Sequence, residues 1–248
     1  MGIKRRTFIQ TSAMAAMGTL LWNCNDADKI LLKKGQTIAC LGDSITATPN
    51  GYVQMLQDYV DTNHPDLELT FLNWGKSSET ITGLTEKEHP GPRPYLFERL
   101  DGLLKSTQVD ILFFCYGINC GIYGKPSQTL FDSYTIGIYT FLEKIKQKGI
   151  KTILLTPPPV VLEAVNDDSV AVTTDFGYQH PYPKYQEEVL QEFREIVLAI
   201  SHETVLGKID IQAPLLRHKN KCYLDDPIHP NKNGHQLITN TIVENLTI

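Results

Sequence analysis

Two blocks near opposite ends of the chain carry a possible nucleophile and its base. Ser44 lies in a turn that begins at Gly42, and such a serine is exposed and close to backbone N–H groups. Asp226 precedes His229 by three residues, so one turn can hold a carboxylate against an imidazole. These residue types predict Ser44 as nucleophile, His229 as general base and Asp226 as the group that orients it. Asp225 competes for the orienting role, but the spacing favours Asp226.

Two further blocks contain groups that can stabilise an oxyanion. Gly75 follows an apolar run, and a glycine there lets the backbone approach a substrate closely enough for its N–H to donate. Asn119 lies between Gly117 and Gly121, and its side-chain NH₂ can point at the same oxygen. Taken singly, the Ser44 and Gly75 blocks are more typical of plain turns. The Asn119 block is equally typical of a turn, and the Asp226–His229 block of a surface Asp–His pair. Together they predict acyl transfer through a serine.

The segments between the blocks predict the scaffold that positions them. Short apolar runs of the kind buried on both faces of a parallel sheet alternate with amphipathic stretches. The predicted strands are Thr37–Leu41, Leu67–Asn73, Asp110–Tyr116, Lys151–Thr156 and Lys208–Ile211. The predicted helices are Tyr52–Thr62, Leu96–Ser106, Leu130–Lys148, Lys184–Ser201 and Asn233–Glu244. This alternation predicts an α/β fold with a central parallel sheet and helices on both faces. Ligands of such sheets bind beyond the carboxyl ends of the strands, where the first three blocks lie.

The order of the four blocks resembles that of the SGNH (GDSL-like) hydrolase family, from Thr37 to the last helix. The Gly-x-Ser-x-Gly elbow of the α/β-hydrolases is absent. The resemblance implies a three-layer α/β/α, flavodoxin-like fold and a serine esterase that uses no cofactor or metal. It also implies an oxyanion hole made of Ser44 N–H, Gly75 and Asn119. One position departs from the family pattern, because Cys120 stands where an aspartate is usual.

Cys120 raises the question of what supports the loop that holds Asn119. A disulfide between Cys120 and Cys222 is one pairing that would brace this loop against the segment leading to His229. The alternative is a buried free thiol that packs as a small apolar group.

Two long loops, residues 78–94 and 157–183, are expected to lie near the strand ends. Their mixture of aromatic and polar residues suits a sugar better than a long acyl chain, which requires an apolar groove. We therefore expect a small-molecule or polysaccharide ester as substrate, with acetyl as the acyl group. Two alternatives stay open: a lipid acylhydrolase or thioesterase, and a non-catalytic carbohydrate-binding relative.

The N-terminal segment has a different composition from the rest. Lys4, Arg5 and Arg6 precede a short apolar run, and this pattern is typical of an export signal of the twin-arginine kind over residues 1–24. Cys24 offers a possible lipid anchor, although Trp22 and Asn23 are not the small residues expected before a lipidated cysteine. We expect residues 25–248 to form a single domain outside the cytoplasm, in the periplasm or at the cell surface. The net charge of −5 argues against a nucleic-acid partner.

Overall fold

The computed structural model describes residues 29–164, 175–224 and 226–248. Five strands form a parallel sheet in the order β3-β2-β4-β5-β6. Counted along the chain, this is the flavodoxin-like order 2-1-3-4-5. The strands are β2 (Thr37–Gly42), β3 (Thr70–Gly75), β4 (Ile111–Cys115), β5 (Lys151–Leu155) and β6 (Val205–Ile209). Two short strands, β1 (Ile30–Leu31) and β7 (Leu246–Thr247), pair separately.

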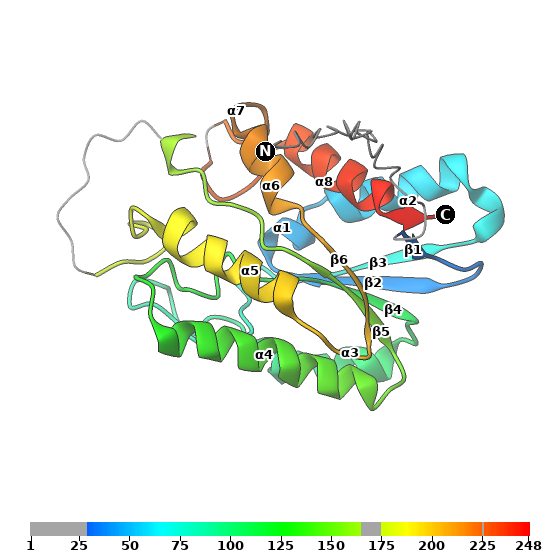
Figure 1. Ribbon diagram of the computed structural model, residues 1–248, viewed down its shortest axis with the longest axis horizontal. Helices are drawn as coiled ribbons and strands as arrows, with labels where there is room; N and C mark the ends of the chain where they lie inside the picture. The colour runs from blue at the N-terminus through cyan, green and yellow to red at the C-terminus, as the bar shows by residue number, and fades with distance from the viewer. Residues whose placement is uncertain (1–28, 165–174, 225) are drawn as a thin grey trace, which may run out of the picture.

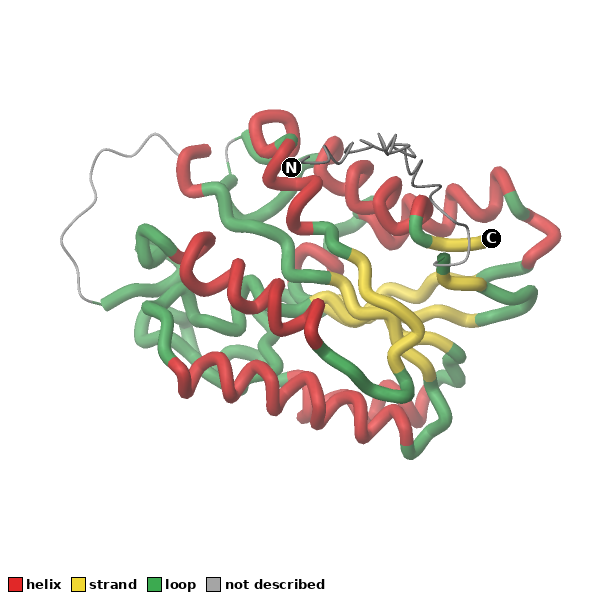
Figure 2. The backbone as a smooth tube through the Cα atoms, in the orientation of Figure 1, coloured by secondary structure: helices red, strands yellow, loops and turns green. Residues whose placement is uncertain are grey.

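Helices cover both faces of the sheet, which confirms the three-layer α/β/α prediction (Figures 1 and 2). On one face α2 (Tyr52–Asn63) packs against α8 (Lys232–Glu244). On the other, α3 (Leu96–Ser106) and α4 (Gln128–Lys146) lie under the sheet, and α5 (Gln191–Ala199) packs beside α4. The shorter helices are α1 (Ser44–Ala47), α6 (Gln212–Arg217) and α7 (Lys219–Cys222). Every residue of β4 is buried, as its continuous apolar run requires.

Several predicted boundaries were wrong, and the reasons are local. Leu67 belongs to a 3₁₀ turn (Pro65–Leu67) and Glu68 is left-handed, so β3 starts at Thr70. The last strand starts at Val205 rather than at Lys208, because Gly207 interrupts its apolar pattern while packing closely against Ile30. The predicted helix from residue 184 begins with a π-helical turn (Gln186–Leu190) and ends at Ala199.

Strand register brings three of the four blocks to one edge of the sheet. Gly42, the last residue of β2, pairs with Gly75 of β3 on one side and with Cys115 of β4 on the other. From β2 the chain adds β3 on one side of the sheet and all later strands on the other side. The loops after β2 and β4 therefore flank the topological switch point. Ser44 and Asn119 follow these two strands.

Candidate active site

Ser44, His229 and Asp226 form a continuous chain of hydrogen bonds. Ser44 Oγ lies 2.9 Å from His229 Nε2, and His229 Nδ1 lies 2.7 Å from Asp226 Oδ2. Because a carboxylate only accepts, Nδ1 donates to Asp226, and Nε2 is left to accept the hydroxyl proton of Ser44. The structure therefore brings together the three residues for which the sequence predicts nucleophile, base and orienter.

The turn from Asp226 to His229 organises its own carboxylate. Asp226 Oδ1 accepts hydrogen bonds from the backbone N–H groups of Ile228 (2.7 Å) and His229 (3.0 Å). Partial burial alone would raise the pKa of Asp226, but these bonds and the imidazole outweigh it and hold the pKa below its usual value. Asp226 is thus kept ionised. Asp225, the alternative orienter, lies outside the described residues.

The Ser44 turn is held by Asp43. Asp43 caps α1, and its Oδ1 accepts from Ile45 N at 3.1 Å. A side chain at Gly42 would meet Thr46 Oγ1 at 2.0 Å, so only glycine lets α1 fold back over the strand end. Ser44 N–H lies in the first turn, where helix N–H groups lack an intrahelical partner. Burial raises the pKa of Asp43 to about 7, and its Oδ2 has no hydrogen-bond partner in the described part of the chain.

Asn119 presents an unpaired donor. Its Oδ1 accepts a hydrogen bond from the Tyr123 hydroxyl at 3.0 Å, which fixes the orientation of the amide. Its Nδ2 is buried and has no hydrogen-bond partner among the residues that the structure describes. A buried donor without a partner costs about 1–3 kcal/mol, so this nitrogen is arranged to meet an oxygen that the protein itself does not supply.

Gly75 does not fit the donor role predicted for it. Its N–H already donates to Asn73 Oδ1 at 2.9 Å. A side chain at Gly75 would meet Ala47 N at 2.2 Å, so the glycine serves the close packing of α1 on the end of β3. The sequence pattern correctly marked a close backbone approach here, but the approaching group is the protein's own helix.

Ser78, three residues further along, fits the donor role predicted for Gly75 better than Gly75 itself does. It lines the same cleft as Ser44 and Asn119. Its φ of +63° is in the left-handed region, which costs a non-glycine residue about 1 kcal/mol. No hydrogen bond to Ser78 N–H occurs within the described part of the chain. No sequence pattern marks Ser78 for this position, since a serine is an unusual residue in this backbone conformation.

Arg93 supports both Ser78 and Asn119. Its guanidinium forms a bidentate ion pair with Glu86, and the two side chains are only 2% and 1% exposed. Its Nη1 donates to Ser78 O at 3.2 Å, and its Cζ lies 5.7 Å from the centroid of the Tyr123 ring. Tyr123 in turn orients Asn119. One buried cation therefore links the supports of two polar groups in the cleft.

Cys120 and Cys222 are both free, so the proposed bridge is absent from the structure. Cys120 is fully buried, and burial raises the pKa of its thiol to about 12. Its carbonyl oxygen instead accepts from Thr82 Oγ1 at 3.0 Å. The loop is braced by side chains of neighbouring segments, and the cysteine packs as a small apolar group.

A cleft of about 350 Å³ opens in front of Ser44. It is lined by Ser44, Ser77, Ser78, His89, Pro90, Arg93, Asn119, Tyr123, Tyr178, Ile228 and His229. His89 and Tyr178 come from the two long loops, residues 78–94 and 157–183, that were expected near the strand ends. His235 is buried in the first turn of α8, and its Nδ1 accepts from Tyr52 N at 3.2 Å.

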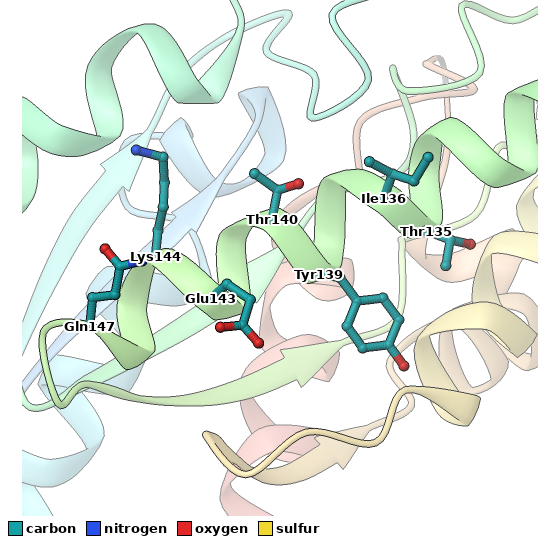
Figure 3. Close-up of a pocket in the computed structure, with 7 residues that line it drawn as sticks. All are labelled: Thr135, Ile136, Tyr139, Thr140, Glu143, Lys144 and Gln147. Carbon is teal, nitrogen blue, oxygen red and sulfur yellow. The ribbon is translucent and has the colours of Figure 1, made fainter.

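A second hollow, of about 500 Å³, lies along the outer face of α4 (Figure 3). Its lining side chains project from α4 and from Gln147, the residue that caps its C-terminus. Its two charged residues are already paired: Lys144 with Asp101 and Glu143 with His202. It contains no nucleophile next to a base, so the cleft at Ser44 is the candidate active site. Among the described residues, no cluster of three His, Cys, Asp or Glu side chains could hold a metal ion.

Residues 40–237 match the profile of the GDSL-like lipase/acylhydrolase family. The chain belongs to this family. It is therefore a carboxylic ester hydrolase. No curated protein matches the sequence.

Two solved structures share the fold of this GDSL-like hydrolase. Axe2, an acetylxylan esterase from Geobacillus stearothermophilus, superposes with a TM-score of 0.64 and 20% identity, over 89% of this chain and 97% of that chain. LAE5, an alpha/beta hydrolase enzyme from the metagenome of Lake Arreo, Spain, has a TM-score of 0.59 and 19% identity, over 86% and 95%. At these identities the similarity establishes the fold.

Asn119 provides a direct test of the oxyanion donor in the GDSL-like hydrolase. Asn119→Ala removes the unpaired Nδ2, and we expect kcat for an aryl acetate to fall about 10²- to 10³-fold with little change in KM. Tyr123→Phe is the matched control, because it removes only the bond that orients Asn119 and should cost about tenfold. Full activity in Asn119→Ala would show that the oxyanion is stabilised elsewhere.

Arg93 should be a major determinant of stability in the GDSL-like hydrolase. Arg93→Met leaves Glu86 buried without a partner, and we expect the free energy of unfolding in urea to fall by about 3–5 kcal/mol. The double variant Glu86→Gln/Arg93→Met should be less destabilised than the single one.

The exposed pair of Lys34 and Glu68 is the control for this comparison. Lys34→Met should change the free energy of unfolding by less than about 1 kcal/mol. A similar small change in Arg93→Met would contradict a structural role for the buried pair.

Proposed function

We propose that this hydrolase removes acetyl groups from a carbohydrate through an acyl-enzyme on Ser44. The observation that carries the proposal is the Ser44–His229–Asp226 chain, which opens on the same cleft as the unpaired Nδ2 of Asn119. A nucleophile with its base and a free donor are the groups that acyl transfer requires.

The steps follow from the geometry. Ser44 Oγ attacks the ester carbonyl carbon while His229 Nε2 takes its proton, and Asp226 stabilises the resulting imidazolium. The oxyanion is held by Asn119 Nδ2 and Ser44 N–H, with Ser78 N–H in the place first predicted for Gly75. His229 then protonates the leaving alcohol. Water, deprotonated by the same imidazole, attacks the acyl-enzyme and releases the acid and Ser44.

The lining of the cleft supports a short acyl group and a polar alcohol. Pro90 and Ile228 are the only aliphatic residues among those that line it, whereas a long acyl chain calls for an apolar groove. Similarity of fold to an enzyme described as an acetylxylan esterase agrees with this choice. A lipid acylhydrolase or a thioesterase is the alternative.

Two experiments test the proposal. A fluorophosphonate probe followed by peptide mapping should label Ser44, whereas a non-catalytic carbohydrate-binding protein would stay unlabelled. Acetylated xylosides should be hydrolysed with a higher kcat/KM than long-chain alkanoyl esters and acyl thioesters. A preference for long chains would overturn the carbohydrate assignment while leaving Ser44 as nucleophile.

We also propose that the protein acts outside the cytoplasm. The support is the sequence pattern of Arg5, Arg6 and the following apolar run, which lies outside the described residues. We expect Arg5→Lys/Arg6→Lys to leave the precursor in the cytoplasm, as measured by cell fractionation. Normal export would exclude a twin-arginine signal.

A lipid anchor at Cys24 is tested in the same cells by growth with radiolabelled fatty acid. If Cys24 carries the lipid, the label should be incorporated into the wild-type protein and lost in Cys24→Ala.

The part of the chain that the structure describes contains no helix long and apolar enough to span a membrane.

A further inference from the structure

His89 offers a hydrogen-bond acceptor in the cleft. Its Nδ1 lies 2.8 Å from the carbonyl oxygen of Gly91. Because a carbonyl oxygen can only accept, Nδ1 carries the ring proton, and Nε2 of the neutral imidazole is an acceptor. Within the described residues, Nε2 of His89 has no hydrogen-bond partner. The residue lines the same cleft as Ser44.

Tyr178 stands next to His89 and completes a corner of the cleft. The two rings meet edge to face, with centroids 6.1 Å apart and an angle of 72° between their planes. Both rings are part of the cleft lining, so the corner combines an aromatic surface with a polar ring nitrogen.

The corner is fixed by contacts between the two loops that carry it. Lys87 Nζ pairs with Asp175 at 3.2 Å, and His180 Nδ1 lies 3.3 Å from Glu88 Oε1. Gly177 packs so closely on the first loop that a side chain there would meet Glu88 Oε2 at 2.7 Å. The close packing of Gly177 on Glu88 places the two loops against each other next to His89 and Tyr178, whereas the exposed Lys87–Asp175 pair adds little to this.

We propose that His89 and Tyr178 form a subsite that recognises a hydroxyl group on the alcohol part of the ester. His89 Nε2 accepts a hydrogen bond from a hydroxyl next to the esterified oxygen, and the Tyr178 ring packs against the carbon skeleton. An acetyl group carries no O–H or N–H, so the alcohol is the part of such an ester that can donate. The inference rests on the proposed function and refines it: the substrate is a partially acylated polyol.

A matched pair of esters isolates this hydrogen bond. The substrates are trans-2-hydroxycyclohexyl acetate and cyclohexyl acetate, which differ by one hydroxyl. We expect the wild-type enzyme to have a kcat/KM about fivefold higher for the hydroxylated ester, the size of one net hydrogen bond. A site built around a hydrogen bond discriminates against the analogue that lacks the donor.

Two variants of His89 separate recognition from loop support. In His89→Asn the amide keeps an N–H near the position of Nδ1 for Gly91 O but has no atom at the position of Nε2. The ratio of kcat/KM for the two esters should therefore fall to about one, through a loss on the hydroxylated ester. Gln in His89→Gln extends an amide oxygen to the position of Nε2 and should restore part of the preference.

The outcomes distinguish this inference from the proposed function. An equal loss on both esters in His89→Asn, or an unchanged preference, would overturn the subsite. So would a wild-type enzyme that does not discriminate between the two esters. The proposed function is judged separately by the acetylated xylosides, and its failure would appear as a preference for long-chain esters in the wild-type enzyme.

Discussion

Replacement of Ser44 by alanine is expected to abolish ester hydrolysis, with a loss of at least about 10⁴-fold in kcat. Ser44 Oγ is the atom that lies 2.9 Å from His229 Nε2, and without it the base has no nucleophile to activate. The backbone of the turn should be unaffected, because Asp43 Oδ1 still accepts from Ile45 N and Thr48 Oγ1 still donates to Ser44 O. The measurement is aryl acetate turnover by purified protein, with circular dichroism to confirm the fold.

Ser77→Ala is the matched control for this experiment. Ser77 lines the same cleft but has no bond to His229. It should keep activity within about threefold of wild type. Turnover by Ser44→Ala within tenfold of wild type would show that another group is the nucleophile.

The sheet and the residues at its edge could be predicted because both depend on local patterns. Continuous apolar runs identify strands that are buried on both faces, and parallel strands end at a common edge. Strand register then sets which residues meet at that edge. Gly42 pairs with both Gly75 and Cys115. Ser44 and Asn119 therefore follow neighbouring strand ends. Asp226 and His229 are close because three residues separate them in one turn.

The role of Gly75 could not be predicted from the sequence. A glycine after a strand indicates that something approaches the backbone closely, but the sequence does not say whether it is a ligand or another part of the protein. Here it is Ala47 of α1. Within the described residues Ser78 N–H is a free donor at this cleft, and its left-handed backbone is one that a serine does not predict.

Arg93, Tyr123 and His89 were missed for a different reason. Their roles depend on partners from other loops: Arg93 reaches Ser78 and Tyr123, Tyr123 orients Asn119, and His89 meets Tyr178. Loop–loop packing leaves no periodic signal in the sequence, so a polar residue in a long loop cannot be told from a solvated one. The structure locates Arg93 and Tyr123 because it shows them buried and paired, and it locates His89 because its ring lines the cleft.

Replacement of Asp226 by asparagine should lower kcat with little change in KM. The carboxylate accepts from His229 Nδ1 at 2.7 Å and so selects the tautomer in which Nε2 can take a proton from Ser44. An amide can keep one acceptor for the backbone N–H groups while offering NH₂ to the ring, which favours the opposite tautomer. A loss of about 10⁴-fold is typical of a buried aspartate in this role.

We expect about 10²- to 10³-fold here, because the Asp226 side chain is 50% exposed and water can partly replace it. The measurement is kcat and KM for an aryl acetate. Asp225→Asn is the matched control, since it removes the same charge one residue earlier in the sequence. Full activity in Asp226→Asn together with a loss in Asp225→Asn would move the orienting role to Asp225. Losses of equal size in both variants would indicate that the negative charge of the turn, rather than one oriented hydrogen bond, supports His229.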